Sequence, residues 1–75
     1  MKINTQVKSD KTDGQVRHII LANQFAEIQV NVCDEMNLVV IHKTFKSSNL
    51  THSLQTNKNE LERIIETIYK NEELF

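Results

Sequence analysis

The stretch FAEIQVNVC, residues 25–33, alternates apolar and polar side chains along most of its length. An alternation with a period of two residues is typical of a β-strand that has one buried and one exposed face. The pattern predicts that Glu27, Gln29 and Asn31 face solvent. The residues expected to face a core are Ala26, Ile28, Val30 and Val32.

Strands are also expected before and after this stretch. LVVIHKTF, residues 38–45, follows the polar turn DEMN, and QVRHIILA, residues 15–22, comes before it; both are rich in residues that favour strands. KINTQVK, residues 2–8, alternates in the same way and is predicted to form the first strand. Asp13 and Gly14 then indicate a tight turn, because glycine readily adopts a positive φ.

The segment NKNELERIIETIYKNEELF, residues 57–75, has the spacing of an amphipathic helix. Asn57 with Glu60 three residues later approximates a capping box, and Thr56 is an alternative N-cap. The apolar residues of the helix form one stripe: Leu61, Ile64, Ile65 and Ile68. The preceding residues 46–56 are mostly polar and turn-like. Leu50, His52 and Leu54 alternate with polar residues, however, so a short edge strand is an alternative prediction for this segment.

These elements predict a single α+β domain over residues 1–75, with the order ββββα. A small antiparallel four-stranded meander is followed by one C-terminal amphipathic helix, which can cover only one face of the sheet. The residues expected on or near the uncovered face are Ile19, Leu21, Phe25 and Cys33. Apolar side chains on an uncovered face indicate a binding site or an oligomer interface.

Composition excludes several classes of function. The 75 residues carry a net charge of −1, and Cys33 is the only cysteine, so no disulfide forms within the chain. A lone cysteine and the lack of a long apolar segment favour a cytoplasmic protein. Gly14 is the only glycine and proline is absent, which excludes a glycine-rich phosphate loop; no cofactor is expected.

The three histidines raise the possibility of a metal site or a catalytic site. His18, His42 and His52 lie on different predicted elements, and neither they nor Cys33 have a spacing typical of metal ligands. A chain of this size also leaves little room for the cleft that a general acid or base requires. We therefore expect no metal site and no catalytic residues, and interpret the chain as a non-enzymatic protein.

Protein binding is the preferred interpretation. The chain ends in KNEELF, residues 70–75, where two acidic and two large apolar side chains stand at the end of the predicted helix. Such a turn is better stabilised by a partner, or by a second copy in a homodimer, than by solvent. Acidic residues on the helix are expected to face a basic target. The residues expected to contact a partner are Phe25, Glu62, Glu66, Glu73, Leu74 and Phe75.

Nucleic-acid binding is the alternative. The order of four strands and a helix, with SLQTNKNEL leading into the helix, resembles the PC4-type single-stranded DNA-binding fold over residues 16–68. The resemblance is one of topology and implies a homodimer that binds single strands. The basic residues expected to contact nucleic acid are Arg17, Lys43, Lys46 and Lys58. In size and style the chain also resembles phage or mobile-element accessory proteins, including anti-CRISPR and other anti-defence inhibitors, which implies steric blocking of a larger target.

Overall fold

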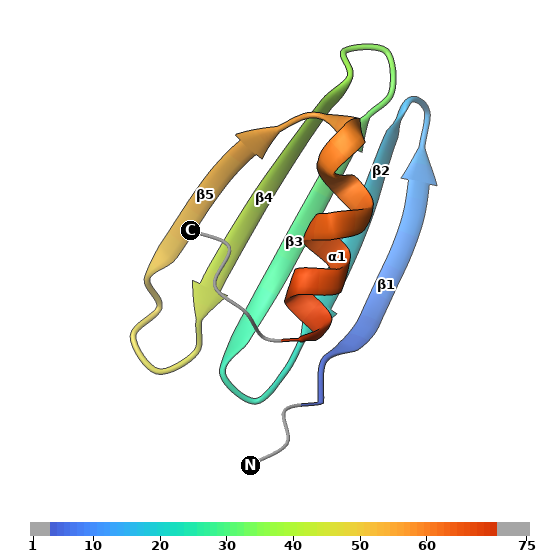
Figure 1. Cartoon of the computed structure of the whole chain (residues 1–75). Helices are drawn as coiled ribbons and strands as arrows, with labels where there is room; N and C mark the ends of the chain where they lie inside the picture. Colours follow the sequence, from blue (N-terminus) through green and yellow to red (C-terminus); the bar gives the residue numbers. More distant parts are fainter. Residues whose placement is uncertain (1–3, 71–75) are drawn as a thin grey trace.

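The computed structural model of the protein describes residues 4–70, which form a five-stranded antiparallel sheet with one helix packed on one face (Figure 1). Each strand pairs with its neighbours in the sequence, so the sheet order is β1-β2-β3-β4-β5. The strands are β1 (Gln6–Asp13), β2 (Val16–Ala22), β3 (Ala26–Cys33), β4 (Leu38–Phe45) and β5 (Thr51–Thr56). They are followed by a 3₁₀ turn, η1 (Lys58–Glu60), and by the helix α1 (Leu61–Tyr69). The α+β class and the meander are confirmed.

The predicted number of four strands is wrong, because the polar segment after β4 forms a fifth strand. β5 pairs with β4 along its whole length, from Thr44 opposite Thr51 to Val39 opposite Thr56. Only one of its residues, Leu54, is apolar, and it packs against the core. A single inward-facing leucine gives only a weak period-two pattern in the sequence. Besides the packing of Leu54, β5 is stabilised by its backbone hydrogen bonds to β4.

The first strand begins and ends later than residues 2–8, the predicted range. The turn at Gly14, where φ is 64°, pairs Asp13 directly with Val16, so β1 must continue to the turn. The polar residues SDKTD, residues 9–13, which follow the predicted first strand, are therefore strand residues. A register shift between Val7 and Ser9 marks an irregularity in β1.

The core lies between the sheet and α1. The alternation predicted for β3 is confirmed: Ala26, Ile28, Val30 and Val32 are all buried. The expectation that Ile19 and Leu21 lie near the uncovered face is wrong, because only 3% and 0% of their surfaces are exposed. Four consecutive apolar residues end β2, residues 19–22, so the sequence does not show which of them face the core. The pairing with β3 decides it, because Ile19 and Leu21 lie opposite the buried Val30 and Ile28.

The helix packs through its predicted stripe. Ile64 and Ile68 are buried, and Leu61 and Ile65 are partly buried against the core. None of the helices in residues 4–70 has the length and apolar character needed to cross a membrane. Residues 71–75, to which the predicted helix extends, lie outside the described part of the chain.

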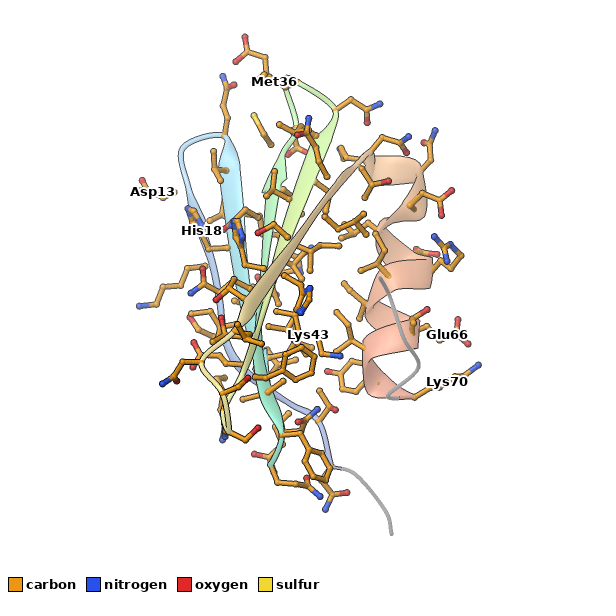
Figure 2. All side chains as sticks on the ribbon, turned by 90° about the vertical axis from the view of Figure 1, so that its left-hand side faces the viewer. Asp13, His18, Met36, Lys43, Glu66 and Lys70 are labelled. Carbon is orange, nitrogen blue, oxygen red and sulfur yellow. The ribbon has the colours of Figure 1, made fainter. Side chains whose placement is uncertain are left out.

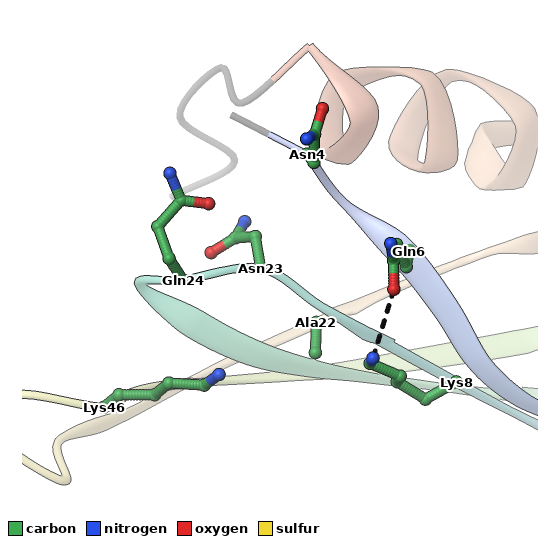
Figure 3. Close-up of a pocket in the computed structure, with 7 residues that line it drawn as sticks. All are labelled: Asn4, Gln6, Lys8, Ala22, Asn23, Gln24 and Lys46. Atoms are coloured by element: carbon green, nitrogen blue, oxygen red, sulfur yellow. Dashed lines mark hydrogen bonds between the residues drawn. The ribbon is translucent and has the colours of Figure 1, made fainter. Parts of the chain in front are cut away.

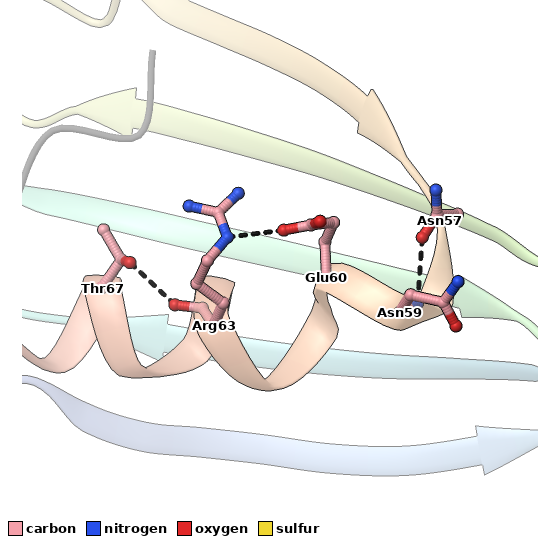
Figure 4. A network of polar contacts seen from close by, with 5 residues as sticks. All are labelled: Asn57, Asn59, Glu60, Arg63 and Thr67. Atoms are coloured by element: carbon pink, nitrogen blue, oxygen red, sulfur yellow. Dashed lines mark hydrogen bonds and ion pairs between the residues drawn. The ribbon is translucent and has the colours of Figure 1, made fainter.

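The start of the helix is held by a chain of polar contacts (Figure 4). Asn57 acts as the N-cap of η1, where its side-chain oxygen accepts a hydrogen bond of 3.0 Å from the backbone N–H of Asn59. The side chain of Glu60 pairs with Arg63, one turn further along, and the hydroxyl of Thr67 donates to the carbonyl oxygen of Arg63 at 2.7 Å. Asn57 is thus a cap as predicted, while Glu60 is engaged with Arg63.

Candidate functional site

The outer face of the sheet, opposite α1, is a surface that no described element covers. Figure 2 shows Asp13 and His18 on this side, with Glu66 and Lys70 on the side of the helix. Cross-strand pairs of polar side chains line the outer face. His18 Nδ1 lies 2.6 Å from Asn31 Oδ1, His42 Nδ1 lies 2.7 Å from Ser53 Oγ, and the hydroxyls of Thr44 and Thr51 are 3.0 Å apart.

An apolar patch occupies the end of the outer face near the β1–β2 and β3–β4 turns. Strand register aligns Val16, Cys33 and Leu38 in one row across β2, β3 and β4. Val40 lies two residues further along β4 on the same face, and all four side chains are only partly buried. Met36, in the β3–β4 turn at this end, is 70% exposed. We call these five residues the apolar patch.

The opposite end of the molecule, at the β2–β3 and β4–β5 turns, is basic and aromatic. The ammonium group of Lys43 lies 4.9 Å from the centroid of the Phe45 ring, and this ring meets His52 edge to face. Phe25 is 44% exposed, and its carbonyl oxygen accepts a hydrogen bond of 2.9 Å from the backbone N–H of Lys46. We call these five residues the basic end. Lys43, Phe45 and His52 lie on the helix side of the sheet, as their register with Ile41 and Leu54 requires.

A shallow pocket of about 230 Å³ opens beside the basic end, between β1 and the turns (Figure 3). Lys8 and Lys46 both line it, and Lys8 Nζ donates to Gln6 Oε1 at 3.2 Å. Asn23, also in its wall, is buried, and its side-chain oxygen accepts hydrogen bonds from the backbone N–H groups of Phe25 and Ala26. The pocket therefore combines two cations with an asparagine that holds the turn. Its other lining residues are Asn4, Ala22 and Gln24.

Two of the four bases predicted to contact nucleic acid lie away from the basic end and are paired. Arg17 donates two hydrogen bonds to the carboxylate of Asp10, at 2.9 and 2.7 Å. The guanidinium lowers the pKa of Asp10, and the carboxylate in turn raises the pKa of Arg17. Lys58 forms an ion pair with Asp34, which follows β3 at the other end of the sheet. The structure brings together only Lys43 and Lys46 of the predicted set.

Of the residues predicted to contact a protein partner, the three that lie within residues 4–70 do not form one surface. Phe25 lies at the basic end, whereas Glu62 and Glu66 lie on the exposed side of α1. Glu66 pairs with Lys70, four residues further along the helix, at 2.7 Å, and this contact lowers the pKa of Glu66. The remaining predicted contacts, Glu73, Leu74 and Phe75, lie outside the described residues.

The histidines and Cys33 are distributed over the outer face and the basic end. His18, His42 and Cys33 all lie on the outer face, but each lies in a different row of cross-strand pairs. His18 is opposite Asn31, and His42 is opposite Gln29. Cys33 lies between Val16 and Leu38. Among residues 4–70, no three histidine, cysteine or acidic side chains come together in a way that could hold a metal ion.

Sequence reasoning missed most of the apolar patch. It placed Cys33 near the uncovered face, but Val16, Leu38 and Val40 were treated as ordinary strand residues. The signal was present in β4: once Val39 and Ile41 are assigned to the core, the residues on either side of Val39 must face outward.

Comparisons with protein-family models, with curated proteins and with solved structures found no match for this chain.

Proposed function

We propose that this chain is a non-enzymatic binding module that uses the outer face of its sheet to hold another protein. The observation that carries the proposal is that α1 covers one face only (Figure 2), while the opposite face bears the apolar patch. An apolar cluster on an open face, surrounded by polar side chains, is typical of protein interaction surfaces. The rest of the outer face carries the cross-strand polar pairs together with two charged side chains, Lys11 and Glu27.

The charges around the apolar patch indicate which kind of partner surface would be complementary to it. Asp13 lies opposite Val16 in the β1–β2 pairing and so extends the row that Val16 begins. Glu35 lies beside Met36 in the β3–β4 turn. Neither carboxylate forms an ion pair with another residue in the described range 4–70. A complementary partner therefore presents apolar side chains flanked by lysine or arginine, and the opposite charges mainly speed association.

Binding of this kind leads to steric inhibition when the surface that is covered belongs to the active or binding site of a larger target. Such a mechanism needs a shaped surface and no catalytic group. Inhibitors of the anti-defence type, which phages and mobile elements encode, work in this way and are the biological class that we propose for this chain.

The test compares two charge variants of immobilised protein in capture from a bacterial lysate. The outer-face variant carries Met36→Lys with Val40→Lys, which places two cations where we expect a basic, apolar partner. The matched variant carries Glu62→Gln with Glu66→Gln, which alters the exposed side of α1 instead. Thermal unfolding of each variant confirms that it is folded before capture is compared.

We expect a specific protein to be retained by the wild type and by the helix variant, and to be lost with the outer-face variant. Retention by both variants, or loss with the helix variant alone, would reject the outer face as the binding surface.

Single-stranded nucleic acid is a second candidate ligand, and the basic end favours it. Lys43 and Lys46 supply charge there, while Phe25 and Phe45 supply rings on which bases can stack. Glu27, at the start of β3, brings a carboxylate to the same end and limits its net charge. Nucleic-acid binding requires no use of the apolar patch, so the two functions are separable.

Titration of a labelled single-stranded oligonucleotide at several salt concentrations tests this candidate. Neutralising two phosphate contacts by Lys43→Gln with Lys46→Gln should reduce the slope of log K against log salt by about 1.4. The control is Arg17→Gln with Lys58→Gln, which removes the same charge from bases that are already paired with Asp10 and Asp34. An equal effect of the two pairs would exclude the basic end as the site.

A further inference from the structure

The two edges of the sheet differ in how well they are protected against pairing. β1, at one edge, carries four charged residues and a register shift: Lys8, Asp10, Lys11 and Asp13. Charges and irregularities are the devices by which exposed edge strands avoid pairing with other strands. β5, at the other edge, has the sequence THSLQT, with no charged residue, no proline and an unbroken register with β4. Only the β5 edge lacks these devices.

The backbone groups at the β5 edge alternate in direction. The backbone N–H of Phe45 donates to the carbonyl oxygen of Leu50 at 2.9 Å, so this pair is a hydrogen-bonded pair of the antiparallel ladder. Hydrogen-bonded and non-hydrogen-bonded pairs alternate along such a ladder. The backbone groups of His52, Leu54 and Thr56 are therefore directed toward β4. Those of the alternate residues are directed away from the sheet: Thr51, Ser53 and Gln55.

We infer that β5 pairs with β5 of a second copy of this chain, to form a two-fold dimer with a continuous ten-stranded sheet. An antiparallel partner strand must present outward-directed groups at the same positions and place its own side chains on matching faces. A second β5 meets both conditions when Ser53 of one copy faces Ser53 of the other. Thr51 then faces Gln55, and the three pairs exchange about six backbone hydrogen bonds.

This register is also the one that the side chains favour. Ser53, Thr51 and Gln55 are exposed neutral residues of the outer face, so their pairing brings no charges together. On the helix side, Leu54 of each copy lies across from His52 of the other. Centring the pairing on Leu54 instead would leave fewer outward groups paired, because Thr51 would then have no partner within the strand.

The helix leaves room for this dimer. α1 lies over the middle strands of the sheet (Figure 1), and its buried residues pack against β2, β3 and β4. The two-fold axis is perpendicular to the sheet, so the two helices lie on the same side and the outer faces of both copies form one surface. The edge is a separate surface from the apolar patch, so the dimer does not depend on the proposed target.

Cross-linking tests the register. In a Cys33→Ser background, Ser53→Cys places two thiols opposite each other, within the Cα separation of about 5.5 Å that a disulfide accepts. Gln55→Cys in the same background is the matched control. It is on the same strand and face, but its counterpart in the dimer lies four residues along, about 14 Å away. We expect rapid dimer formation under mild oxidation with Ser53→Cys only; equal rates for both variants, or no cross-link with either, would overturn the inference.

Sedimentation over about a hundredfold range of protein concentration tests the dimer without cross-linking. The wild type should shift toward the dimer mass as concentration rises. Ser53→Lys should weaken association by roughly tenfold or more, because two like charges then oppose each other at the axis. Thr12→Lys, which adds the same charge to the β1 edge, should leave association unchanged. A wild type that remains monomeric at the highest concentration would disprove the dimer.

Discussion

Arg17 holds Asp10 through two parallel hydrogen bonds across the β1–β2 hairpin, from Nε to Oδ1 at 2.9 Å and from Nη2 to Oδ2 at 2.7 Å. This geometry gives planar, bidentate recognition of a carboxylate. It joins the charged edge strand to the strand that lines the core, and it keeps Arg17 from acting as a free cation on the surface.

The first prediction concerns the titration of this pair. The hydrogen bond to Arg17 is the main reason why the pKa of Asp10 is lowered. Stability gained from a lowered carboxylate pKa is present above the unfolded value and is lost as pH falls through the folded value. In Arg17→Gln the pKa of Asp10 should return toward its ordinary value, as measured by NMR titration. An Asp10 pKa that stays equally low in the variant would show that Arg17 is not the cause.

The second prediction separates the two faces of β2. Leu21→Ala should lower the free energy of unfolding by about 2–5 kcal/mol, because Leu21 is fully buried and the deletion leaves a cavity. Ile20→Ala, the neighbouring residue on the outer face, should cost roughly 1 kcal/mol. Chemical denaturation of both variants measures the difference. Similar costs at the two positions would contradict the assignment of faces.

The third prediction concerns the β2–β3 turn. Asn23→Ala should destabilise the fold by roughly 2 kcal/mol or more, because the backbone N–H groups of Phe25 and Ala26 then lose their acceptor. Gln24→Ala, one residue further on and exposed, should change the unfolding free energy by less than about 0.5 kcal/mol. Thermal unfolding compares the two; a harmless Asn23→Ala would mean that water replaces the amide oxygen.

The fourth prediction tests the helix cap. Asn57→Ala should cost about 0.5–2 kcal/mol, since the backbone N–H of Asn59 loses the side-chain oxygen that caps it. Glu60→Gln should cost less, because its pairing with Arg63 is a partly exposed contact at helical spacing. Helical signal during urea unfolding provides the readout, and the reverse order of costs would assign the main cap to Glu60.

Much of the fold can be predicted from local pattern, and the failures share one physical cause. β3 alternates so regularly that its buried residues are identifiable from sequence alone. In HIIL three apolar residues follow one another, so the sequence does not show which of them face the core. Only the pairing of Ile19 and Leu21 with β3 decides this. β5 is polar because one of its faces is open and its neighbour β4 supplies the hydrogen bonds. Pairing between strands, which carries no local signal, determined both outcomes.

The candidate surfaces were predicted less well for the same reason. Lys43 and Lys46 are close in sequence and remain together at the basic end, whereas Arg17 and Lys58 are drawn to acidic residues near the other end of the sheet. The apolar patch combines residues from three strands. Its existence depends on cross-strand register, which sets Val16, Cys33 and Leu38 side by side.

The order of the strands also has a kinetic consequence. Because every strand pairs with its sequence neighbours, each hairpin can close a short loop as soon as its two arms are available, which favours rapid folding. The helix is the exception: Ile64 and Ile68 pack against buried strand residues, the last of which, Ile41, precedes Ile64 by more than twenty residues. A nascent chain whose α1 is still inside the ribosome therefore lacks the helix that buries the inner face of the sheet, and docking of the helix completes the core.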